Sequence, residues 1–246
     1  MFQVVIAQRA ERPTSASAFA LYRALRRVNP SPYLFLLELG DVALVGSSPE
    51  TVVKCEHRRA ALNPIAGTIA PGEGDAEALL SSVKDRAEHT MLVDLGRNDL
   101  SRVCTPGSVK VERFMTPERY SHVTHLVSEV VGDLRADVTP FELLRACFPA
   151  GTVSGAPKVR AMQIISELEQ YRRGVYAGAV GYVFPQEDEL DTCIAIRTLV
   201  LRDGVAYLQA GGGIVADSDP AEEHQECLNK LAALERAIEL AEAEHR

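Results

Sequence analysis

The stretch YLFLLELGDVALVGSSPETVVKCEHRRAAL, residues 33–62, decides the fold class. It contains apolar segments at 33–39, 42–45, 51–55 and 59–62, separated only by short turns. Strands joined by tight turns run antiparallel, because a parallel pair needs a long crossover connection. The stretch therefore predicts an antiparallel meander and argues against a doubly wound parallel sheet.

Helical and strand patterns are mixed along the rest of the chain. A short strand is expected at 2–7 and a helix at 15–27, with Ser15 or Ser17 as its N-cap. The other expected helices are 75–95, 139–147, 157–169 and 220–243, and the other expected strands are 108–114, 120–131, 190–201 and 205–210. Asp203-Gly204 is a strong β-hairpin signal between the last two strands.

Composition excludes several classes of function. The 246 residues carry a formal net charge of −8, which disfavours nucleic acid as a partner. The five cysteines are scattered without metal-ligand spacing, so they are expected to be reduced thiols. The first apolar run is too short for a signal or membrane helix. We therefore expect a cytoplasmic protein that binds neither nucleic acid nor a membrane.

The segment FPAGTVSGAPKVR, residues 148–160, leads small residues into a helix that opens at Pro157-Lys158. Backbone N–H groups at the start of a helix can bind an anion. The segment lacks the Gly-x-x-x-x-Gly-Lys-Ser/Thr pattern of a phosphate loop. The residue types alone fit either an anion cradle of unknown ligand or a tight loop packed under a helix.

Two acidic pairs recur at helical spacing. Asp85 and Glu88 share one helix face, and Glu223 and Glu226 share a face of the last helix. Lys230 follows Glu226 by one turn. Such pairs are most often solvated helix faces, yet two carboxylate-bearing helices can also hold one hard cation such as Mg²⁺.

Three further polar residues stand at positions that fit either chemistry or structure. Alternation in the strand expected at 190–201 turns Arg197 to an apolar side, where a guanidinium needs a salt bridge or an anion. His125 also faces an apolar side, as a satisfied core histidine or a functional one. Glu50 closes the turn SSPE (47–50), as a surface acid or a proton donor.

These residues lie in motifs that resemble the chorismate-utilising enzymes, and most closely the large subunit (component I) of anthranilate synthases. The similar segments cover nearly the whole chain: SSPE (47–50), PIAGT (64–68), KDRAEHTMLVDLGRNDLSRV (84–103), RYSHVTHLVSEV (119–130), GTVSGAPKVRAMQII (151–165), YAGAVGY (176–182), LDTCIAIRT (190–198) and QAGGGIVADSDP (209–220). The resemblance implies an α+β fold, an α/β sandwich of mostly antiparallel sheets packed together with helices outside. It also implies one catalytic domain over 1–246, without the family's N-terminal region.

The resemblance implies Mg²⁺ as the cofactor and chorismate as the substrate. Glu88 and Glu226 match the direct metal ligands, while Asp85 and Glu223 match the acids that act largely through water. Lys230 matches the lysine that faces the substrate carboxylate.

Arg197 and Tyr176 match the residues that bind the carboxylate of the enolpyruvyl side chain in these enzymes. The glycine run after them would let backbone N–H groups approach the same anion. The other residues matched to the substrate site are Ala66, Gly67, Thr68, Thr152, Gly211, Gly212 and Gly213.

Two acid–base residues and two neutral positions define the expected chemistry. Glu50 matches the glutamate that protonates the departing ring hydroxyl, and His125 matches the histidine tied to pyruvate elimination. Gln3 replaces the lysine that activates water in isochorismate and salicylate synthases. Ala66 replaces the nucleophilic lysine of aminodeoxychorismate synthases. Both replacements favour direct addition of ammonia.

The function implied is that of anthranilate synthase component I, a Mg²⁺-dependent lyase of tryptophan biosynthesis that makes anthranilate and pyruvate from chorismate and ammonia. No glutaminase nucleophile motif is evident, so a glutamine amidotransferase subunit is expected to supply the ammonia. The alternatives are an aminodeoxyisochorismate or aminodeoxychorismate synthase, or an inactive chorismate-binding fragment. Asn29, Pro30 and Tyr33 match part of the tryptophan feedback site, or simply connect a helix to a strand.

Overall fold

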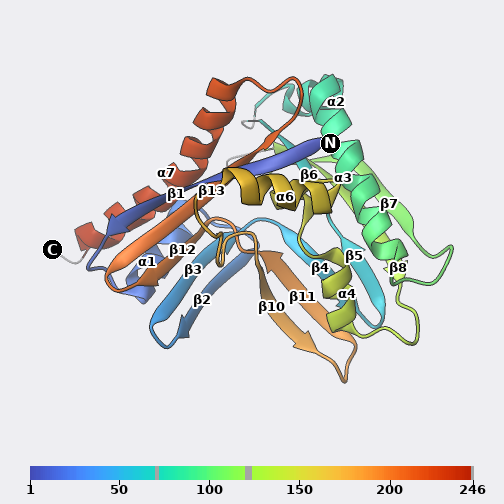
Figure 1. Cartoon of the computed structure of the whole chain (residues 1–246), viewed down its shortest axis with the longest axis horizontal. Helices are drawn as coiled ribbons and strands as arrows, with labels where there is room; N and C mark the ends of the chain where they lie inside the picture. The colour runs from blue at the N-terminus through green and yellow to red at the C-terminus, as the bar shows by residue number, and fades with distance from the viewer. Residues whose placement is uncertain (70–71, 120–123, 245–246) are drawn as a thin grey trace. The chain divides into compact units, whose positions relative to one another are not determined.

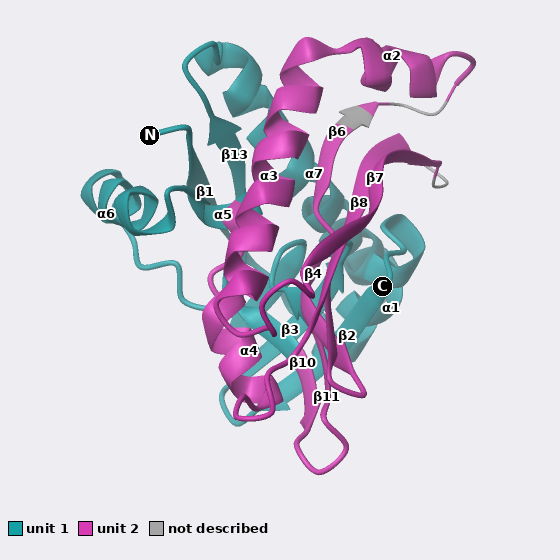
Figure 2. Cartoon of the chain, turned by 90° about the vertical axis from the view of Figure 1, so that its right-hand side faces the viewer, with its two compact units in different colours: residues 1–49, 152–180, 193–246 teal, residues 50–151, 181–192 magenta. Residues whose placement is uncertain are grey.

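The computed structural model describes residues 1–69, 72–119 and 124–244 (Figure 1). Its helices and antiparallel sheets confirm the expected α+β class. The chain forms two compact units that are interleaved in sequence (Figure 2). Unit 1 comprises residues 1–49, 152–180 and 193–246, and unit 2 comprises residues 50–151 and 181–192.

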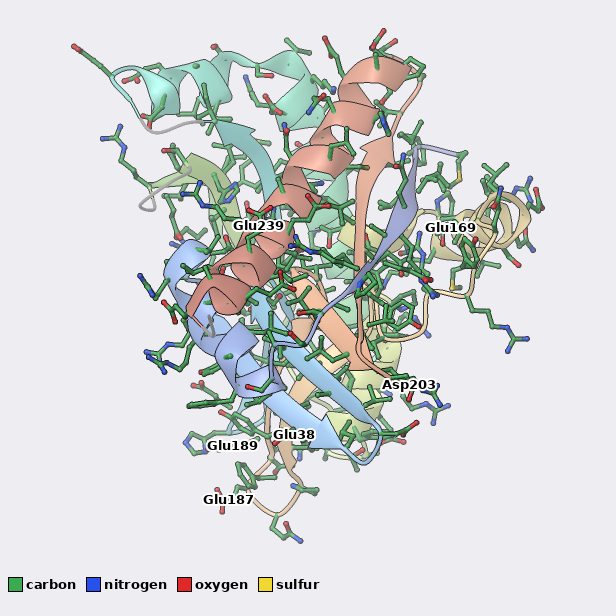
Figure 3. All side chains as sticks on the ribbon, turned by 90° about the vertical axis from the view of Figure 1, so that its left-hand side faces the viewer. Glu38, Glu169, Glu187, Glu189, Asp203 and Glu239 are labelled. Atoms are coloured by element: carbon green, nitrogen blue, oxygen red, sulfur yellow. The ribbon has the colours of Figure 1, made fainter. Side chains whose placement is uncertain are left out.

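Unit 1 is built on a six-stranded sheet with the strand order β2-β3-β12-β13-β1-β9. In chain order these strands are β1 (Gln3–Pro13), β2 (Tyr33–Leu39), β3 (Val42–Ser48), β9 (Gly155–Ala156), β12 (Thr198–Arg202) and β13 (Val205–Ile214). Asp203 and Gly204 have φ angles of +51° and +73°, the left-handed pair that a tight two-residue hairpin requires. The predicted hairpin between β12 and β13 is therefore confirmed, with Asp203 at its tip (Figure 3).

Two amphipathic helices form the core of unit 1 with this sheet. They are α1 (Ala18–Val28) and α7 (Pro220–Glu244), and both contribute to a buried apolar cluster with the sheet. Ser17 caps α1, since its side chain accepts a hydrogen bond from the N–H of Ala20 at 3.2 Å. Of the two expected capping residues, the structure therefore selects Ser17.

The small-residue segment 148–160 contains the short helix α5 (Gly151–Ser154), the strand β9 and the start of α6 (Lys158–Leu168). Gly155 has a φ of +133°, and a Cβ atom there would lie 2.2 Å from the carbonyl oxygen of Gln3. Only glycine allows β9 to approach β1 this closely. The structure thus supports the packed-loop interpretation of this segment.

Unit 2 contains a seven-stranded sheet with the order β10-β11-β4-β5-β8-β6, in which β7 also pairs with β8. Its strands are β4 (Thr51–Glu56), β5 (Arg59–Leu62), β6 (Ile65–Ile69), β7 (Lys110–Arg119), β8 (Thr124–Asp133), β10 (Ala179–Phe184) and β11 (Glu189–Ile194). Its helices are α2 (Asp75–Ser81), α3 (Val83–Ser101) and α4 (Pro140–Cys147). Helix α3 packs on β6 and β8, and α4 packs on α3 and β4.

Two expected strand arrangements are wrong because the chain changes sheets. The four segments of 33–62 form two hairpins, with β2 and β3 in the sheet of unit 1 and β4 and β5 in that of unit 2. The strand expected at 190–201 is divided between β11 and β12, which belong to different sheets. Arg197 lies at the break with a φ of +50°.

Two other boundaries also differ from expectation. The helix expected at 75–95 is two helices, because Ser82 ends α2 and caps α3 by accepting the N–H of Asp85 at 3.2 Å. The strand expected at 120–131 is described from Thr124 onward, and its residues 120–123 lie outside the described part.

The structure can be compared with two expectations, that the cysteines are reduced thiols and that the chain has no membrane helix. All five cysteines are buried and none is joined in a disulfide within the described chain. Among the described helices, none combines the length and the apolar character that a membrane span needs.

Asp75 joins the start of α2 to the sheet of unit 2. Its buried carboxylate accepts hydrogen bonds from Arg119 at 2.5 and 3.0 Å, from Thr124 Oγ1 at 2.7 Å and from the N–H of Ala76 at 2.7 Å. The hydrogen bonds from Arg119, followed by that from Thr124, hold the pKa of Asp75 well below its ordinary value of 3.8.

This depressed pKa predicts acid sensitivity. A group whose pKa is lowered by folding stabilises the fold above its unfolded pKa of 3.8, and this contribution is lost as the pH falls below that value. We expect Asp75→Asn to lower the melting temperature at pH 7 and to flatten the fall in stability below about pH 4. Thermal melts between pH 2 and pH 7 measure both effects. Asp94→Asn, at an exposed position of α3, is the matched control, and an Asp75→Asn curve parallel to wild type would refute the assignment.

Candidate functional site

The predicted site residues are divided between the two units. Those in unit 1 are Gln3, Asn29, Pro30, Tyr33, Thr152, Tyr176, Arg197, Gly211, Gly212, Gly213, Glu223, Glu226 and Lys230. Those in unit 2 are Glu50, Ala66, Gly67, Asp85, Glu88 and His125, together with Thr68, whose side chain lies outside the described part. Several members of each set are drawn together within their own unit.

Lys230 links helix α7 to the glycine run at the end of β13. Its Nζ atom donates a hydrogen bond to the carbonyl oxygen of Gly211 at 2.8 Å. The same ammonium forms an ion pair at 2.5 Å with Glu226, one helical turn earlier. Lys230 therefore connects Glu226 of α7 to the glycine run.

Tyr176 approaches the same glycine. A Cβ atom on Gly211 would lie 2.9 Å from the phenol oxygen of Tyr176 and 2.7 Å from the carbonyl oxygen of Ile6. Burial raises the pKa of the Tyr176 phenol far above its ordinary value, so the group stays protonated and can donate a hydrogen bond. Gly211 is needed because any larger residue would displace this donor.

Glu223 lies against the middle glycine of the run. Its side chain accepts a hydrogen bond from Ser218 Oγ at 2.7 Å. A Cβ atom on Gly212 would lie 3.3 Å from Glu223 Oε2. Glu223 is buried and Glu226 is exposed, so the two acids of α7 have different surroundings.

Arg197 occupies a strained position between two strands. Its φ of +50° is in the left-handed region, and its carbonyl oxygen accepts the N–H of Ser47 at 3.1 Å. Burial lowers the pKa of its guanidinium, an effect that the Glu226 carboxylate opposes, and arginine remains charged in either case. No described residue accepts a hydrogen bond from this guanidinium, which suits it to bind an anion. Arg197 lies in the break between β11 and β12, so strand alternation does not apply to its side chain.

The segment matched to the feedback site is tied to Ser47. Asn29 Nδ2 donates to the carbonyl oxygen of Ser47 at 3.4 Å, and Ser47 Oγ donates to the carbonyl oxygen of Asn29. Ser47 is fully buried and also contacts the Arg197 backbone, as noted above. A short path of hydrogen bonds therefore joins the end of α1 to the position of Arg197.

Gly67 organises the predicted residues of unit 2. Its φ is +70°, and a Cβ atom there would lie 3.5 Å from Asp85 Cγ. His125 Nδ1 lies 2.9 Å from the Gly67 carbonyl oxygen. A carbonyl oxygen only accepts, so Nδ1 carries the proton and, in the neutral ring, Nε2 is the basic nitrogen. Asp85 and His125 thus meet at Gly67, and Glu88 follows on α3 one turn after Asp85.

His89, which the sequence analysis did not single out, anchors this part of α3. It is fully buried, and its Nε2 lies 2.6 Å from Ser128 Oγ on β8. Ser128 Oγ also accepts the N–H of Met115 at 2.9 Å. Burial lowers the pKa of His89 to about 4, so the ring is neutral at neutral pH. The sequence indicates this residue only through its position next to Glu88 in a polar helix.

The remaining predicted residues are placed as follows. Glu50 is half-buried at the start of unit 2, and Ala66 is buried in β6. Gln3 is only 3% exposed and pairs with Ala156 of β9. Thr152 lies in α5, and its Oγ1 is buried with no hydrogen-bond partner among the described residues.

The acidic residues fit a hard cation by their chemistry. Each unit contributes one of the two predicted carboxylate pairs, and Mg²⁺ takes one or two carboxylates together with water and ligand oxygens. Over the described chain, no group of three or more His, Cys, Asp or Glu side chains is gathered as a metal site.

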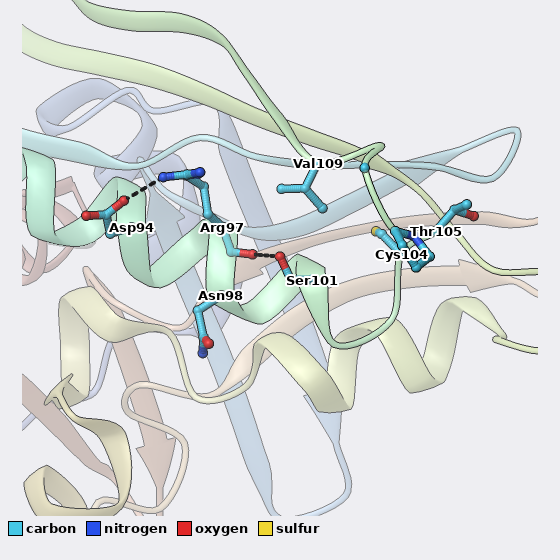
Figure 4. Close-up of a pocket in the computed structure, with 9 residues that line it drawn as sticks. Asp94, Arg97, Asn98, Ser101, Cys104, Thr105 and Val109 are labelled. Atoms are coloured by element: carbon cyan, nitrogen blue, oxygen red, sulfur yellow. Dashed lines mark hydrogen bonds and ion pairs between the residues drawn. The ribbon is translucent and has the colours of Figure 1, made fainter.

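A separate cavity of about 420 Å³ lies in unit 2, at the end of α3 and the loop after it (Figure 4). Asp94 and Arg97 form an ion pair of 3.0 Å on its wall, and Ser101 Oγ donates to the Arg97 carbonyl oxygen at 2.6 Å. Of the described residues that line it, none is a predicted site residue. This cavity is therefore distinct from the residues matched to the substrate site.

Comparisons with known proteins give consistent matches. Residues 1–236 match the model of the chorismate binding enzyme family. The chain is 55% identical to the probable anthranilate synthase component 1 of Schizosaccharomyces pombe, covering 98% of this chain and 51% of that protein. It is 53% identical to anthranilate synthase component 1 of Geobacillus stearothermophilus, covering 98% of this chain and 49% of that protein.

Solved structures agree. Anthranilate synthase component I from Streptococcus pneumoniae matches with a TM-score of 0.89 and 46% identity, over 95% of this chain and 53% of that one. The menaquinone-specific isochorismate synthase from Escherichia coli matches with a TM-score of 0.85 and 28% identity, over 97% and 56%. The chain spans about half the length of the curated relatives it matches. By the family match over nearly all its residues, and by these relatives, the chain belongs to the chorismate-binding enzymes.

Proposed function

We propose that the chain is the catalytic part of an anthranilate synthase component I, which converts chorismate and ammonia to anthranilate and pyruvate. The observation that carries the proposal is the arrangement in unit 1 of Tyr176 and Lys230 around Gly211, with Arg197 in electrostatic contact with Glu226 and Tyr176. A desolvated guanidinium and a protonated phenol suit a carboxylate of the substrate. The relatives named anthranilate synthase component 1, at 53% and 55% identity, support the same activity.

Arg197 and Tyr176 bind the carboxylate of the enolpyruvyl side chain in this proposal. Backbone N–H groups of Gly211, Gly212 and Gly213 contribute to the same anion site. Lys230 faces a carboxylate of the substrate, and its ammonium is held near the glycine run. These cationic and neutral hydrogen-bond donors match the two carboxylates of chorismate.

The acidic pairs are assigned to a Mg²⁺ ion. Glu88 and Glu226 are the direct ligands, and Asp85 and Glu223 act through water. When bound, Mg²⁺ supplies a positive template and an electrophile for the ring carboxylate. Family membership and the oxygen donors within each unit support this assignment.

Glu50 and His125 carry the proton transfers. Ammonia attacks the ring carbon beside the ring carboxylate, the hydroxyl leaves as water, and Glu50 supplies its proton. Pyruvate is then eliminated while a ring proton moves to the enolpyruvyl methylene carbon, with Nε2 of His125 as the base that assists. The orientation of His125 by the Gly67 carbonyl supports this role.

Gln3 and Ala66 favour ammonia addition over the alternatives. Gln3 has no basic group to activate water, and Ala66 has no nucleophile to form a covalent adduct. The ammonia comes from a glutamine amidotransferase subunit as partner. Thr152, Ala66, Gly67 and Thr68 line the substrate site.

Regulation and location complete the proposal. Asn29, Pro30 and Tyr33 would supply part of a tryptophan feedback site. The five thiols without disulfides fit a reducing compartment, so the location proposed is the cytoplasm.

The proposed activity is tested with the purified chain, chorismate, an ammonium salt and Mg²⁺. We expect the fluorescence of anthranilate to rise, and to need all three additions. Mass spectrometry of the product identifies the alternatives: accumulation of aminodeoxyisochorismate indicates a synthase that stops before elimination. Chorismate binding without turnover indicates a protein that binds chorismate but does not convert it. Either outcome overturns the proposal.

The metal assignment predicts the effects of four acids. Glu88→Gln and Glu226→Gln should each abolish Mg²⁺-dependent turnover, whereas Asp85→Asn and Glu223→Gln should lower it about 10–100-fold, as outer ligands do. Calorimetric titration with Mg²⁺ measures binding without turnover. Glu222→Gln, at an exposed neighbouring position of α7, is the matched control. Full activity in Glu88→Gln or Glu226→Gln would remove that residue from the metal site.

The role of His125 predicts a change of product. We expect His125→Met to consume chorismate at a rate close to wild type but to accumulate aminodeoxyisochorismate, because only the elimination needs the imidazole. Chorismate consumption is the internal control for folding and for the first step. Chromatography with mass detection separates the two products. Anthranilate formed at the wild-type rate would contradict the assignment.

A further inference from the structure

An ion pair that the sequence analysis did not identify lies close to Tyr176. Glu169 follows the last residue of α6 (Figure 3), and Arg173 comes four residues later. Arg173 Nε lies 2.9 Å from Glu169 Oε2, and Nη2 lies 2.6 Å from Glu169 Oε1. The two side chains are only 16% and 6% exposed. The contact is a two-pronged, largely buried ion pair, unlike the usual exposed pair at this spacing.

The remaining polar atoms of the pair bind backbone groups of other elements. Arg173 Nη1 donates to the carbonyl oxygen of Val153 at 2.5 Å, and Nη2 donates to that of Val5 at 2.7 Å. Glu169 Oε1 accepts the N–H of Ala7 at 2.9 Å. The pair therefore fixes the Arg173 guanidinium against β1 and α5 from several directions.

The fixed guanidinium lies over the ring of Tyr176. Arg173 Cζ is 5.4 Å from the ring centroid, within the range of a cation–π contact. The N–H of Tyr176 also donates to the Arg173 carbonyl oxygen at 3.2 Å, so the two residues share one tight turn. Tyr176 is held on its ring face by Arg173, while its phenol oxygen reaches Gly211.

A simple contribution to stability does not explain this arrangement. Burying an ion pair costs desolvation free energy for both charges, and well-packed apolar residues often stabilise a fold as much or more. What apolar residues cannot do is hold a cation at a fixed place on an aromatic face. The arrangement is thus suited to orientation.

We propose that Glu169 and Arg173 are positioning residues that set the angle of the Tyr176 ring and thereby aim its phenol at the carboxylate bound by Arg197. This inference rests on the proposed function, in which Tyr176 contacts the substrate. Glu169 keeps the Arg173 fork in place, and Arg173 keeps the ring in place.

The test measures chorismate KM and kcat separately in Arg173→Lys. Lysine keeps the charge but lacks the planar fork, so it cannot bind Glu169, Val153 and Val5 together. We expect KM to rise between about 10-fold and 100-fold, with a smaller change in kcat. Arg172→Lys, at the exposed neighbouring position, is the matched control and should leave KM unchanged.

A double-mutant cycle with Tyr176→Phe separates positioning from general packing. If Arg173 acts through the phenol, Arg173→Lys should change KM less than about 2-fold once that hydroxyl is absent. The same fold-change in both backgrounds would overturn the proposal, as would an unchanged KM in the single Arg173→Lys variant.

Folding is controlled with a charge-free pair. The double variant Glu169→Leu, Arg173→Met leaves no unpaired buried charge, although it removes the partners of the Val5, Val153 and Ala7 backbone groups. Circular dichroism checks that it folds, and its KM should rise as in Arg173→Lys. A wild-type KM in this variant would overturn the proposal. If the wild-type chain neither binds nor converts chorismate, the proposed function fails; if it does and these variants keep its KM, only the positioning role fails.

Discussion

The central constraint in unit 1 is the partly buried charge of Arg197. A guanidinium that loses part of its hydration on burial is stabilised by a nearby anion that replaces it. The Glu226 carboxylate offsets this charge electrostatically, and no described residue accepts a hydrogen bond from the guanidinium. The left-handed backbone at Arg197 shows that the chain accepts strain to keep it there. The surrounding contacts of Gly211, with Lys230 and Tyr176, are consistent with a site prepared for a ligand anion.

In unit 2, hydrogen bonds of histidine side chains hold the predicted site residues in place. His125 is oriented by the Gly67 carbonyl oxygen, and Asp85 lies against the same glycine. His89 is neutral and binds Ser128, which fixes the helix carrying Asp85 to the strand carrying His125. A neutral anchor has a smaller desolvation cost than an ion pair, so the helix can be buried on one face while its acids remain half-buried on another.

Local signals in the sequence predicted the elements that depend on a few adjacent residues. Ser17 at the start of α1 and Asp203-Gly204 in the last hairpin are such cases. The path of the chain between sheets was not predicted, because turns and alternation do not reveal which sheet a strand joins. Arg197 was therefore assigned to a strand interior although it lies at a break. The sequence does not predict the buried ion pair of Glu169 and Arg173, because a spacing of four residues is also that of an ordinary exposed pair on a helix.

Backbone contacts explain how one fold can carry related but different chemistry. The carbonyl oxygens of Gly211, Gly67 and Arg197 each accept a hydrogen bond that fixes part of the predicted site. Such contacts depend on the path of the chain more than on the residues around it, which agrees with a TM-score of 0.85 to an isochorismate synthase that is only 28% identical. Gln3 and Ala66 are buried and take no part in these backbone contacts through their side chains. In the proposed function, substitution at Gln3 or Ala66 changes which nucleophile is accepted, while the backbone contacts of Gly211, Gly67 and Arg197 are kept.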